Sequence, residues 1–205
     1  MEESTRTPAA PGPPDPAEAD LLRKSQSGNR FAFEEIVKRY QRRVYGVAFR
    51  IVRRHDVADD VAQEAFIRAH AAIASFDLAR PFGPWIFRIA ANLAVNHTRS
   101  KAARETPLPE SHVERGSRAE DPLTGVLEGE AQAVLSQALG RLPAEQRAVF
   151  VLRVVEELSY KEIAEALSIN VGTVMSRLAR AREKLRAALL PYLGAAAMSR
   201  AGGQP

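Results

Sequence analysis

The chain has 205 residues, of which 45% are hydrophobic and 26% are charged, a length that suits one domain or two small ones. It contains no cysteine, which excludes disulfide bonds and thiolate metal sites, and its four histidines are scattered without ligand spacing. No apolar run approaches the span of a bilayer, and the acidic, proline-rich start is unlike a signal peptide. We therefore expect a cytoplasmic protein with no membrane insertion.

Charge alternates along the chain. The formal net charge is −4 over residues 1–20, +9 over residues 21–104, −5 over residues 105–130 and +4 over residues 131–205. Basic blocks fit a polyanionic partner, although an excess of arginine also favours simple solubility. The sequence thus has two basic parts, each preceded by an acidic segment.

The first basic part is predicted to be helical. Residues 1–18 are rich in proline and acid and are expected to be disordered, and the helical pattern begins at Ala19. Apolar residues then recur at spacings of three and four between Phe31 and Arg54, which indicates one long helix. A further helix is expected from Asp56 to near Phe76, with carboxylates in its first turn.

A loop and a third long helix complete this part. Residues 77–84 contain two prolines and a glycine, which predicts a loop, and Trp85 opens the next helix. An indole after such a loop is typical of a core residue that anchors it. The acidic residues 105–130 show no sustained period and are interpreted as a flexible linker.

The second basic part is also predicted to be helical, with helices over residues 135–142 and from about Pro143 onward. Residues 194–205 are expected to form a frayed tail. No strand pattern or internal repeat is visible. The predicted fold class is therefore all-α, with two small helical domains at residues 19–104 and 131–193.

A helix-turn-helix is predicted within the second part. Ser159 and Glu162 form a capping box that opens one helix, and Asn170 is suited to cap the next. The second helix has an apolar stripe and, opposite it, a polar and cationic face consisting of Thr173, Ser176, Arg177 and Arg180. An ordinary helical hairpin with a solvated charged face is the alternative. Caps at both helix starts, and five cations against one acid between Val171 and Arg186, favour insertion into a DNA major groove.

Four segments in order resemble the signatures of bacterial extracytoplasmic-function sigma factors. They are AFEEIVKRYQRRVYGVAFRIV, DVADDVAQEAFIRA, PWIFRIAANLAVNHTR and LPAEQRAVFVLRVVEELSYKEIAEALSINVGTVMSRLARAREKLR. The resemblance covers residues 31–104 and 135–188. It implies an initiation factor that catalyses nothing itself: sigma domain two docks on the clamp of RNA polymerase and opens the −10 element, and sigma domain four reads the −35 element.

The resemblance also implies partners and sites in the first domain. The partners are core RNA polymerase, at its clamp and flap regions, promoter DNA and an anti-sigma factor that can hold the protein at a membrane; no cofactor, metal or small-molecule substrate is expected. The positions that match the family's polymerase-docking motif are Asp60, Gln63, Glu64 and Phe66. Recognition of the −10 element falls on Asn92, Asn96 and Arg99, with residues 77–82 ahead of them as a base pocket. The alternatives are a solvated acidic helix start and, for Asn92, a structural hydrogen bond.

In the second domain the resemblance assigns −35 recognition to Arg153, Gly172, Thr173, Met175, Ser176, Arg177, Ala179 and Arg180. Ser176 and Arg180 are the main candidates for base contacts, and Arg153 and Arg177 for backbone or base edges. The sequence departs from the family at Met175, often basic, and at Ala179, often larger. Ser168 and Glu157 occupy turn positions where glycine is usual.

Two other classes of function compete with this one. A non-sigma DNA-binding regulator would use only the helix-turn-helix, with residues 31–104 as a sensing or dimerising domain, but such a domain needs neither the docking motif nor the asparagine-bearing basic helix. An enzyme would need a nucleophile–base pair, phosphate loop or metal-ligand cluster, and none is evident. The sequence leaves open whether the two domains pack together in the free protein.

Overall fold

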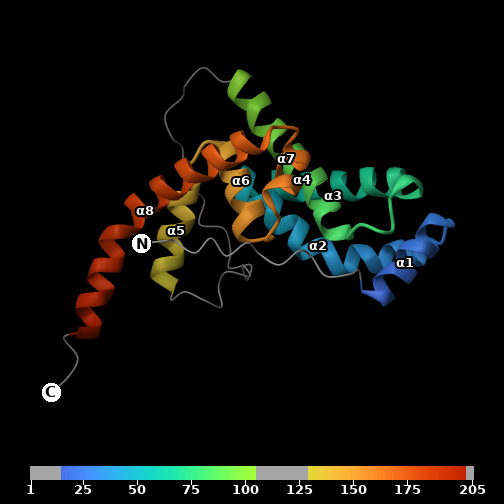
Figure 1. Ribbon diagram of the computed structural model, residues 1–205, viewed down its shortest axis with the longest axis horizontal. Coiled ribbons are helices and arrows are strands. Elements are labelled where there is room, and N and C mark those ends of the chain that lie inside the picture. The colour runs from blue at the N-terminus through green and yellow to red at the C-terminus, as the bar shows by residue number, and fades with distance from the viewer. Residues whose placement is uncertain (1–14, 105–128, 202–205) are drawn as a thin grey trace.

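The structure, a computed structural model, describes residues 15–104 and 129–201. These residues form eight α-helices, a short 3-10 helix and no strand, which confirms the predicted all-α class (Figure 1). The N-terminal tail up to residue 14 and residues 105–128 of the expected linker lie outside the described residues. None of the described helices is both long and apolar enough to cross a membrane.

The N-terminal bundle contains α1 (Pro16–Gln26), α2 (Arg30–Val52), α3 (His55–Ala72), the 3-10 helix η1 (Ile73–Ser75) and α4 (Phe82–Arg104). Helix α2 is central, since α1, α3 and α4 all pack against it. The apolar spacing in the sequence explains this position. Ile36, Val44, Val47 and Ile51 share one stripe of α2 and are fully buried.

The C-terminal bundle contains α5 (Gly129–Gly140), α6 (Ala144–Val154), α7 (Tyr160–Leu167) and α8 (Val171–Ala201). The predicted apolar stripe of α8, Val174, Leu178, Ala181 and Leu185, is buried against its neighbours. Helices α5, α6 and α7 all pack on α8. This packing leaves the opposite face of α8 directed outward.

Several boundaries differ from the sequence predictions. Helix α1 begins at Pro16, three residues earlier than expected, because Asp15 caps it and proline suits a first turn. Helix α4 begins at Phe82 rather than Trp85. Pro84 is tolerated there because it lies in the first turn, where a backbone amide would have no intrahelical hydrogen-bond partner. Helix α5 begins at Gly129, inside the range assigned to the linker.

The C-terminus also differs from the prediction. Residues 194–201, expected to be part of a frayed tail, continue α8 to Ala201. The helix passes through Pro191, which removes one backbone hydrogen bond, and an alanine-rich segment with high helix propensity follows it.

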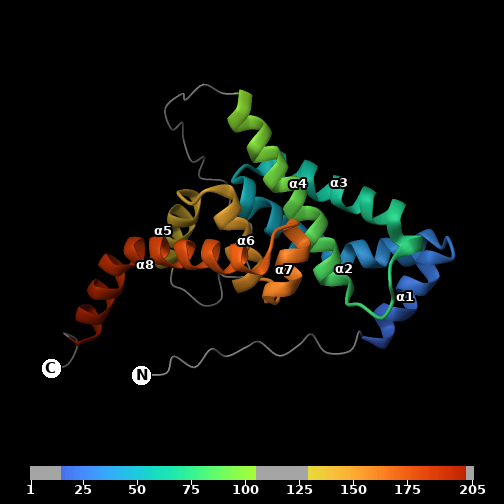
Figure 2. The same cartoon turned by 45° about the horizontal axis from the view of Figure 1, so that its top comes forward.

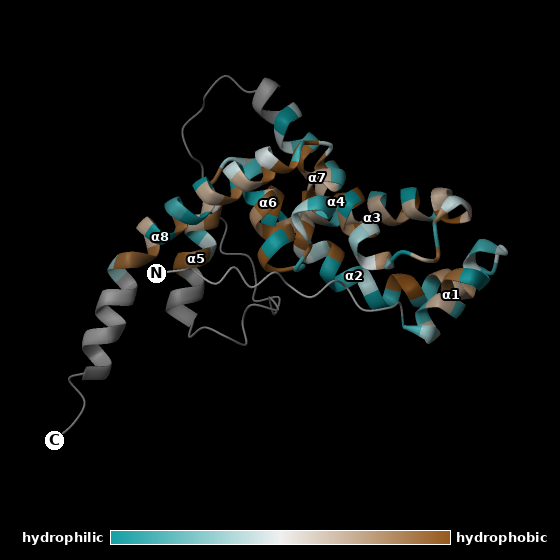
Figure 3. Cartoon of the chain, in the orientation of Figure 1, coloured by the Kyte–Doolittle hydropathy of each residue, from teal (hydrophilic) through white to brown (hydrophobic). Residues whose placement is uncertain are grey.

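The two bundles pack together. Helix α4 lies against α6 and α7, and α2 lies against α6 (Figures 1 and 2). One continuous apolar cluster runs from Ile36 and Phe87 in the first bundle to Leu152 and Ile163 in the second. Brown residues accordingly gather where α4, α6 and α7 meet (Figure 3). The two predicted domains therefore share a core in the free chain.

The turn before α8 generates a stability prediction. Ser168 has φ 53°, a left-handed conformation in which an L side chain crowds the following carbonyl. Ser168→Gly is expected to raise the free energy of unfolding by about 1 kcal/mol, measured by urea denaturation. The control Ser100→Gly, in the right-handed helix α4, should lower it by about 0.5 kcal/mol. A loss of stability in Ser168→Gly would contradict the proposed backbone strain.

Candidate promoter and polymerase-binding surfaces

The helix-turn-helix is formed by α7 and α8, as predicted. The capping box is present in full: Ser159 Oγ accepts a hydrogen bond from the Glu162 amide at 3.2 Å, and the Glu162 carboxylate accepts one from the Ser159 amide at 2.7 Å. The Asn170 side chain caps α8 by accepting from the Thr173 amide at 3.2 Å. These caps fix the chain entry into both helices without any ligand.

The turns on either side of α7 explain two departures noted in the sequence. Glu157 has φ 58° and Ser168 has φ 53°, so both positions have the left-handed backbone that favours glycine. Ser168 ends α7, and its amide donates to the carbonyls of Ala164 and Glu165. The fold thus retains the turn geometry without glycine.

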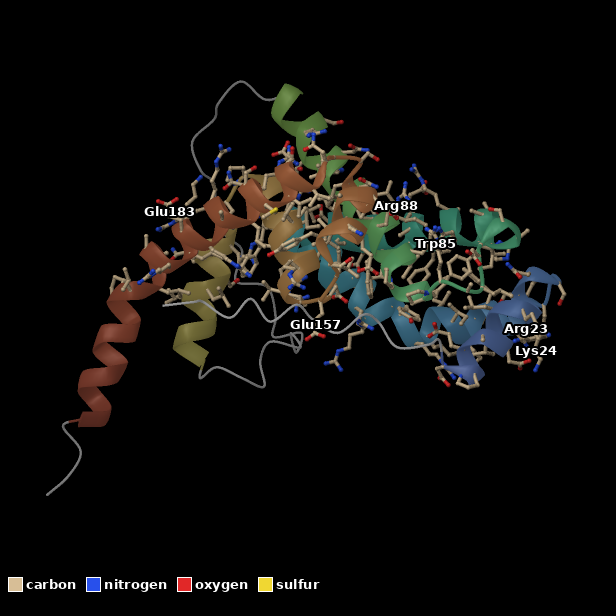
Figure 4. The ribbon with its side chains drawn as sticks, in the orientation of Figure 1. Arg23, Lys24, Trp85, Arg88, Glu157 and Glu183 are labelled. Carbon is tan, nitrogen blue, oxygen red and sulfur yellow. The ribbon has the colours of Figure 1, made fainter. Side chains whose placement is uncertain are left out.

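The outward face of α8 carries most of the predicted −35 positions. Gly172, Met175, Ser176, Ala179 and Arg180 are exposed. Thr173 and Arg177 are half-buried. Farther along the helix Glu183 also projects outward (Figure 4). This face therefore presents hydroxyl, guanidinium and apolar groups from the first turns of a single helix, beside an N-terminus that favours phosphate.

Arg153 is placed differently from the other −35 positions. Its Nη1 donates to the Leu158 carbonyl at 3.2 Å, and its guanidinium lies 5.2 Å from the centre of the Tyr160 ring. These contacts join the end of α6 to the start of α7. Arg153 thus has a structural role in the free protein that the sequence did not indicate.

The predicted docking residues lie along α3. Asp60 and Gln63 are exposed, and Glu64 is half-buried and accepts from Arg68 Nε at 2.7 Å. Phe66 is half-buried and lines an open hollow of about 250 Å³ together with Phe33, Ile67 and His70. Ile67 was missed by sequence reasoning although it is 63% exposed. The signal available in the sequence was an apolar residue within the otherwise charged face of the helix.

The predicted −10 positions are not equally accessible. Asn96 is exposed. Asn92 Nδ2 donates to the Ala166 carbonyl of α7 at 2.5 Å, and Arg99 Nε donates to the Glu145 carboxylate of α6 at 2.9 Å. The structure thus brings two of the three positions into contact with the C-terminal bundle. For Asn92 it displays the structural hydrogen bond that was the alternative.

The loop ahead of α4 is held by aromatic packing. The Trp85 ring centre lies 4.8 Å from that of Phe76 and 5.4 Å from that of Phe82, which is fully buried. Trp85 is labelled beside this loop in Figure 4. These contacts agree with the interpretation of Trp85 as a loop anchor. They give residues 77–82 a defined position at the N-terminal end of α4.

Burial between the bundles shifts the pKa values of two charged side chains. Desolvation lowers the pKa of Arg147 to about 10, with a further contribution from the positive charge of Arg53. Burial also raises the pKa of the Glu156 carboxyl, although Arg43 and Arg50 oppose that shift. No cluster of three or more His, Cys, Asp or Glu residues suited to a metal occurs among the described residues.

Comparisons with known proteins cover both bundles. Residues 36–104 match the family described as sigma-70 region 2, and residues 132–185 match that described as sigma-70, region 4. The chain is 36% identical to RNA polymerase sigma-H factor of Pseudomonas aeruginosa, over 84% of this chain and 94% of the relative. It is 36% identical to the ECF RNA polymerase sigma factor SigW of Bacillus subtilis, over 80% and 92% of the two chains.

A solved structure has a similar fold. It is that of CnrH in complex with the cytosolic domain of CnrY, and the likeness has a TM-score of 0.58 with 29% sequence identity. The likeness covers 84% of this chain and 97% of the solved one. The similarity therefore extends over both helical bundles.

The contacts of Arg153 generate a prediction. Arg153→Lys keeps the charge but replaces the planar guanidinium with a compact ammonium, which cannot make both contacts. The free energy of unfolding is therefore expected to fall by about 1 kcal/mol. Urea denaturation measures the change. Arg180→Lys, on the exposed face of α8, is the matched control and should change stability by less than about 0.5 kcal/mol. Equal effects in the two variants would remove the structural role from Arg153.

Proposed function

The chain belongs to the extracytoplasmic-function RNA polymerase sigma factors, which direct promoter-specific initiation of transcription, and we propose that its two bundles divide promoter recognition. Residues 19–104 act as sigma domain two and residues 131–193 as sigma domain four, with residues 105–130 as the connection. Domain two binds the polymerase clamp and the −10 element. Domain four binds the polymerase flap and the −35 element. The polymerase performs the chemistry.

Recognition of the −35 element is supported by the exposed polar face at the start of α8, the observation that carries this proposal. Ser176 and Arg180 are exposed on that face and are proposed to contact base edges in the major groove. A Cβ added at Gly172 would meet no atom within 4 Å, so a DNA backbone can approach this position closely. Thr173, Met175 and Arg177 complete the interface, and Arg153 supports it from α6.

Recognition of the −10 element is proposed for Asn92, Asn96 and Arg99. An asparagine amide can both donate to and accept from an unstacked base edge, and arginine holds phosphate. The anchored loop at residues 77–82 offers a place for a base removed from the stack. Asn96 is accessible as it stands, whereas Asn92 and Arg99 must exchange their partners on α6 and α7 for DNA.

Polymerase docking is proposed for the face of α3 that carries Asp60, Gln63 and Glu64, because two acids on one helix face, of which Asp60 is exposed, suit a basic partner helix. Phe66 and the exposed Ile67 provide the apolar part of this contact. A central apolar residue with charged neighbours is the common arrangement of an interface.

We also propose regulation by an anti-sigma factor and action in the cytoplasm, where that factor can hold the protein at a membrane. The likeness to CnrH supports the first part, since that relative of similar fold was solved with the cytosolic domain of CnrY. Transcription in cells with and without each co-transcribed partner tests it. The same activity under both conditions would contradict regulation by those partners.

Transcription in vitro tests the central proposal. Core RNA polymerase, this protein and a genomic DNA library are combined, and the transcript starts are sequenced. The expected starts share two upstream elements about two helical turns, or roughly 70 Å, apart. Absence of core-dependent starts, with DNA binding retained, would overturn the proposed division and every site in the first bundle.

Arg180 provides a test of base recognition. Arg180→Ala is expected to weaken binding of holoenzyme to the mapped promoter by about 1–3 kcal/mol, mostly at one −35 base pair. Binding is measured on a panel of single-base promoter variants at fixed salt. Lys184→Ala, farther along α8, serves as the control and should have a smaller effect that does not depend on sequence. An equal loss for Arg180→Ala on every promoter variant would reassign that residue to phosphate.

Asp60 provides a test of docking. Asp60→Arg reverses an exposed charge and is expected to reduce affinity for core polymerase at least about tenfold, because a matched charge becomes a repulsive one. Affinity is measured by fluorescence anisotropy of labelled protein. Asp20→Arg, a charge reversal on α1, is the control and should leave affinity unchanged. Equal effects of the two reversals would show a response to net charge alone.

A further inference from the structure

Three apolar side chains form a stripe on the outward side of α8. Val171, Met175 and Ala179 are four residues apart, so they follow one edge of the helix. All three are exposed, and Met175 is 53% exposed. Two of the six large apolar side chains exposed in the described residues thus fall in the first two turns of this helix. Exposed apolar side chains gathered on one edge mark a surface suited to contact with a partner.

The apolar stripe and the cationic side chains occupy opposite edges of the same outward face. From the helical period of about 3.6 residues, Arg177 and Arg180 lie toward one edge and Met175 toward the other. Gly172 and Ser176 lie between these edges. Because a Cβ added at Gly172 would meet no atom within 4 Å, the face can approach a DNA groove closely. A helix in the major groove therefore brings an apolar edge, as well as a cationic one, to the base pairs.

The chemistry of Met175 restricts which base it can favour. Its thioether side chain is flexible and polarisable, and it has no hydrogen-bond donor. Among the four standard bases, the one apolar group in the major groove is the C5-methyl group of thymine. Arginine or lysine at this position would instead donate to O6 and N7 of guanine. An exposed methionine on a base-reading helix thus favours thymine and gives no attraction for guanine.

The neighbouring hydroxyl groups favour the same base pair. Ser176 Oγ donates to the Thr173 carbonyl at 3.1 Å, and Thr173 Oγ1 donates to Asn170 Oδ1 at 2.6 Å. Because both protons are used inside the chain, the remaining lone pairs of these hydroxyls can only accept. The amino groups that donate in the major groove are N6 of adenine and N4 of cytosine. An adenine–thymine pair therefore supplies a donor for Ser176 and a methyl group for Met175.

We propose that Met175, supported by Val171, recognises the C5-methyl group of a thymine in the −35 element. The inference rests on the proposed function, because it takes the outward face of α8 as the surface that reads this element. It adds to that function a preference that the arginines of the face do not provide. The −35 element of this protein contains an adenine–thymine pair that is selected through its methyl group.

Replacement of thymidine by deoxyuridine tests the methyl contact, because this change removes the C5-methyl group and retains the base-pairing groups. Each thymine in either strand of the −35 element of the mapped promoter is replaced in turn. The affinity of the holoenzyme is measured by competition at fixed salt. At one position the parent protein is expected to lose about fourfold in affinity, the factor that burial of one methyl group contributes. Met175→Ala is expected to bind the thymine and uracil promoters equally at that position.

Two further variants check the assignment to Met175. Met175→Leu keeps an apolar side chain and should retain most of the discrimination between thymine and uracil. Leu190→Ala removes another exposed apolar side chain of α8, several turns beyond the reading face, and is the matched control. It should leave the discrimination unchanged. Both Met175 and Leu190 are more than half exposed, so these substitutions should preserve the fold, which circular dichroism checks.

The outcomes separate the methyl contact from the proposed function. A −35 element without thymine in either strand, or a parent protein insensitive to every uracil substitution, overturns the methyl contact while initiation itself is retained. Equal sensitivity in the parent and in Met175→Ala also overturns it, because the effect would then come from DNA shape or from another residue. Absence of core-dependent starts overturns the proposed function, and the inference with it.

Discussion

Burial of the apolar stripe of α2 is the constraint on which both bundles depend. Helices α1, α3 and α4 pack against α2, whose apolar stripe is fully buried, and α6 of the other bundle packs on the same helix. A fully buried aliphatic side chain contributes about 1.5–3 kcal/mol relative to an exposed one, so this stripe alone outweighs the surface ion pairs nearby. The polar contacts between the bundles therefore select an arrangement that apolar burial makes possible.

Charge in this protein is organised by exposure. Acids on α3 and cations on α8 remain at the surface, where they cost little and are available to partners. At the bundle boundary Arg50 and Arg147 are buried and Arg53 is half-buried instead, and desolvation lowers the pKa of all three. The net charge of +4 thus comprises two populations of arginine, one exposed at the surface and one packed within the chain.

Local structure could be predicted from the sequence, whereas contacts across the bundles could not. The capping box at Ser159 and the cap at Asn170 each depend on residues three positions apart, so sequence alone could specify them. The predicted end of α8 was wrong, because tolerance of Pro191 depends on the helix propensity of its neighbours. The bond from Asn92 to Ala166 joins residues far apart in sequence, and no periodicity encodes such a pairing. Residue types thus indicate chemistry, but their partners depend on tertiary packing.

The outward face of α8 is separable from the core that supports it. Gly172 has open space around it, and Met175, which is 53% exposed, contributes little to the buried stripe on the other side of the helix. Substitutions on this face therefore carry almost no folding penalty. Under the proposed −35 role of this face, promoter preference can therefore change through single substitutions, at positions such as 175 and 179, while the fold is retained.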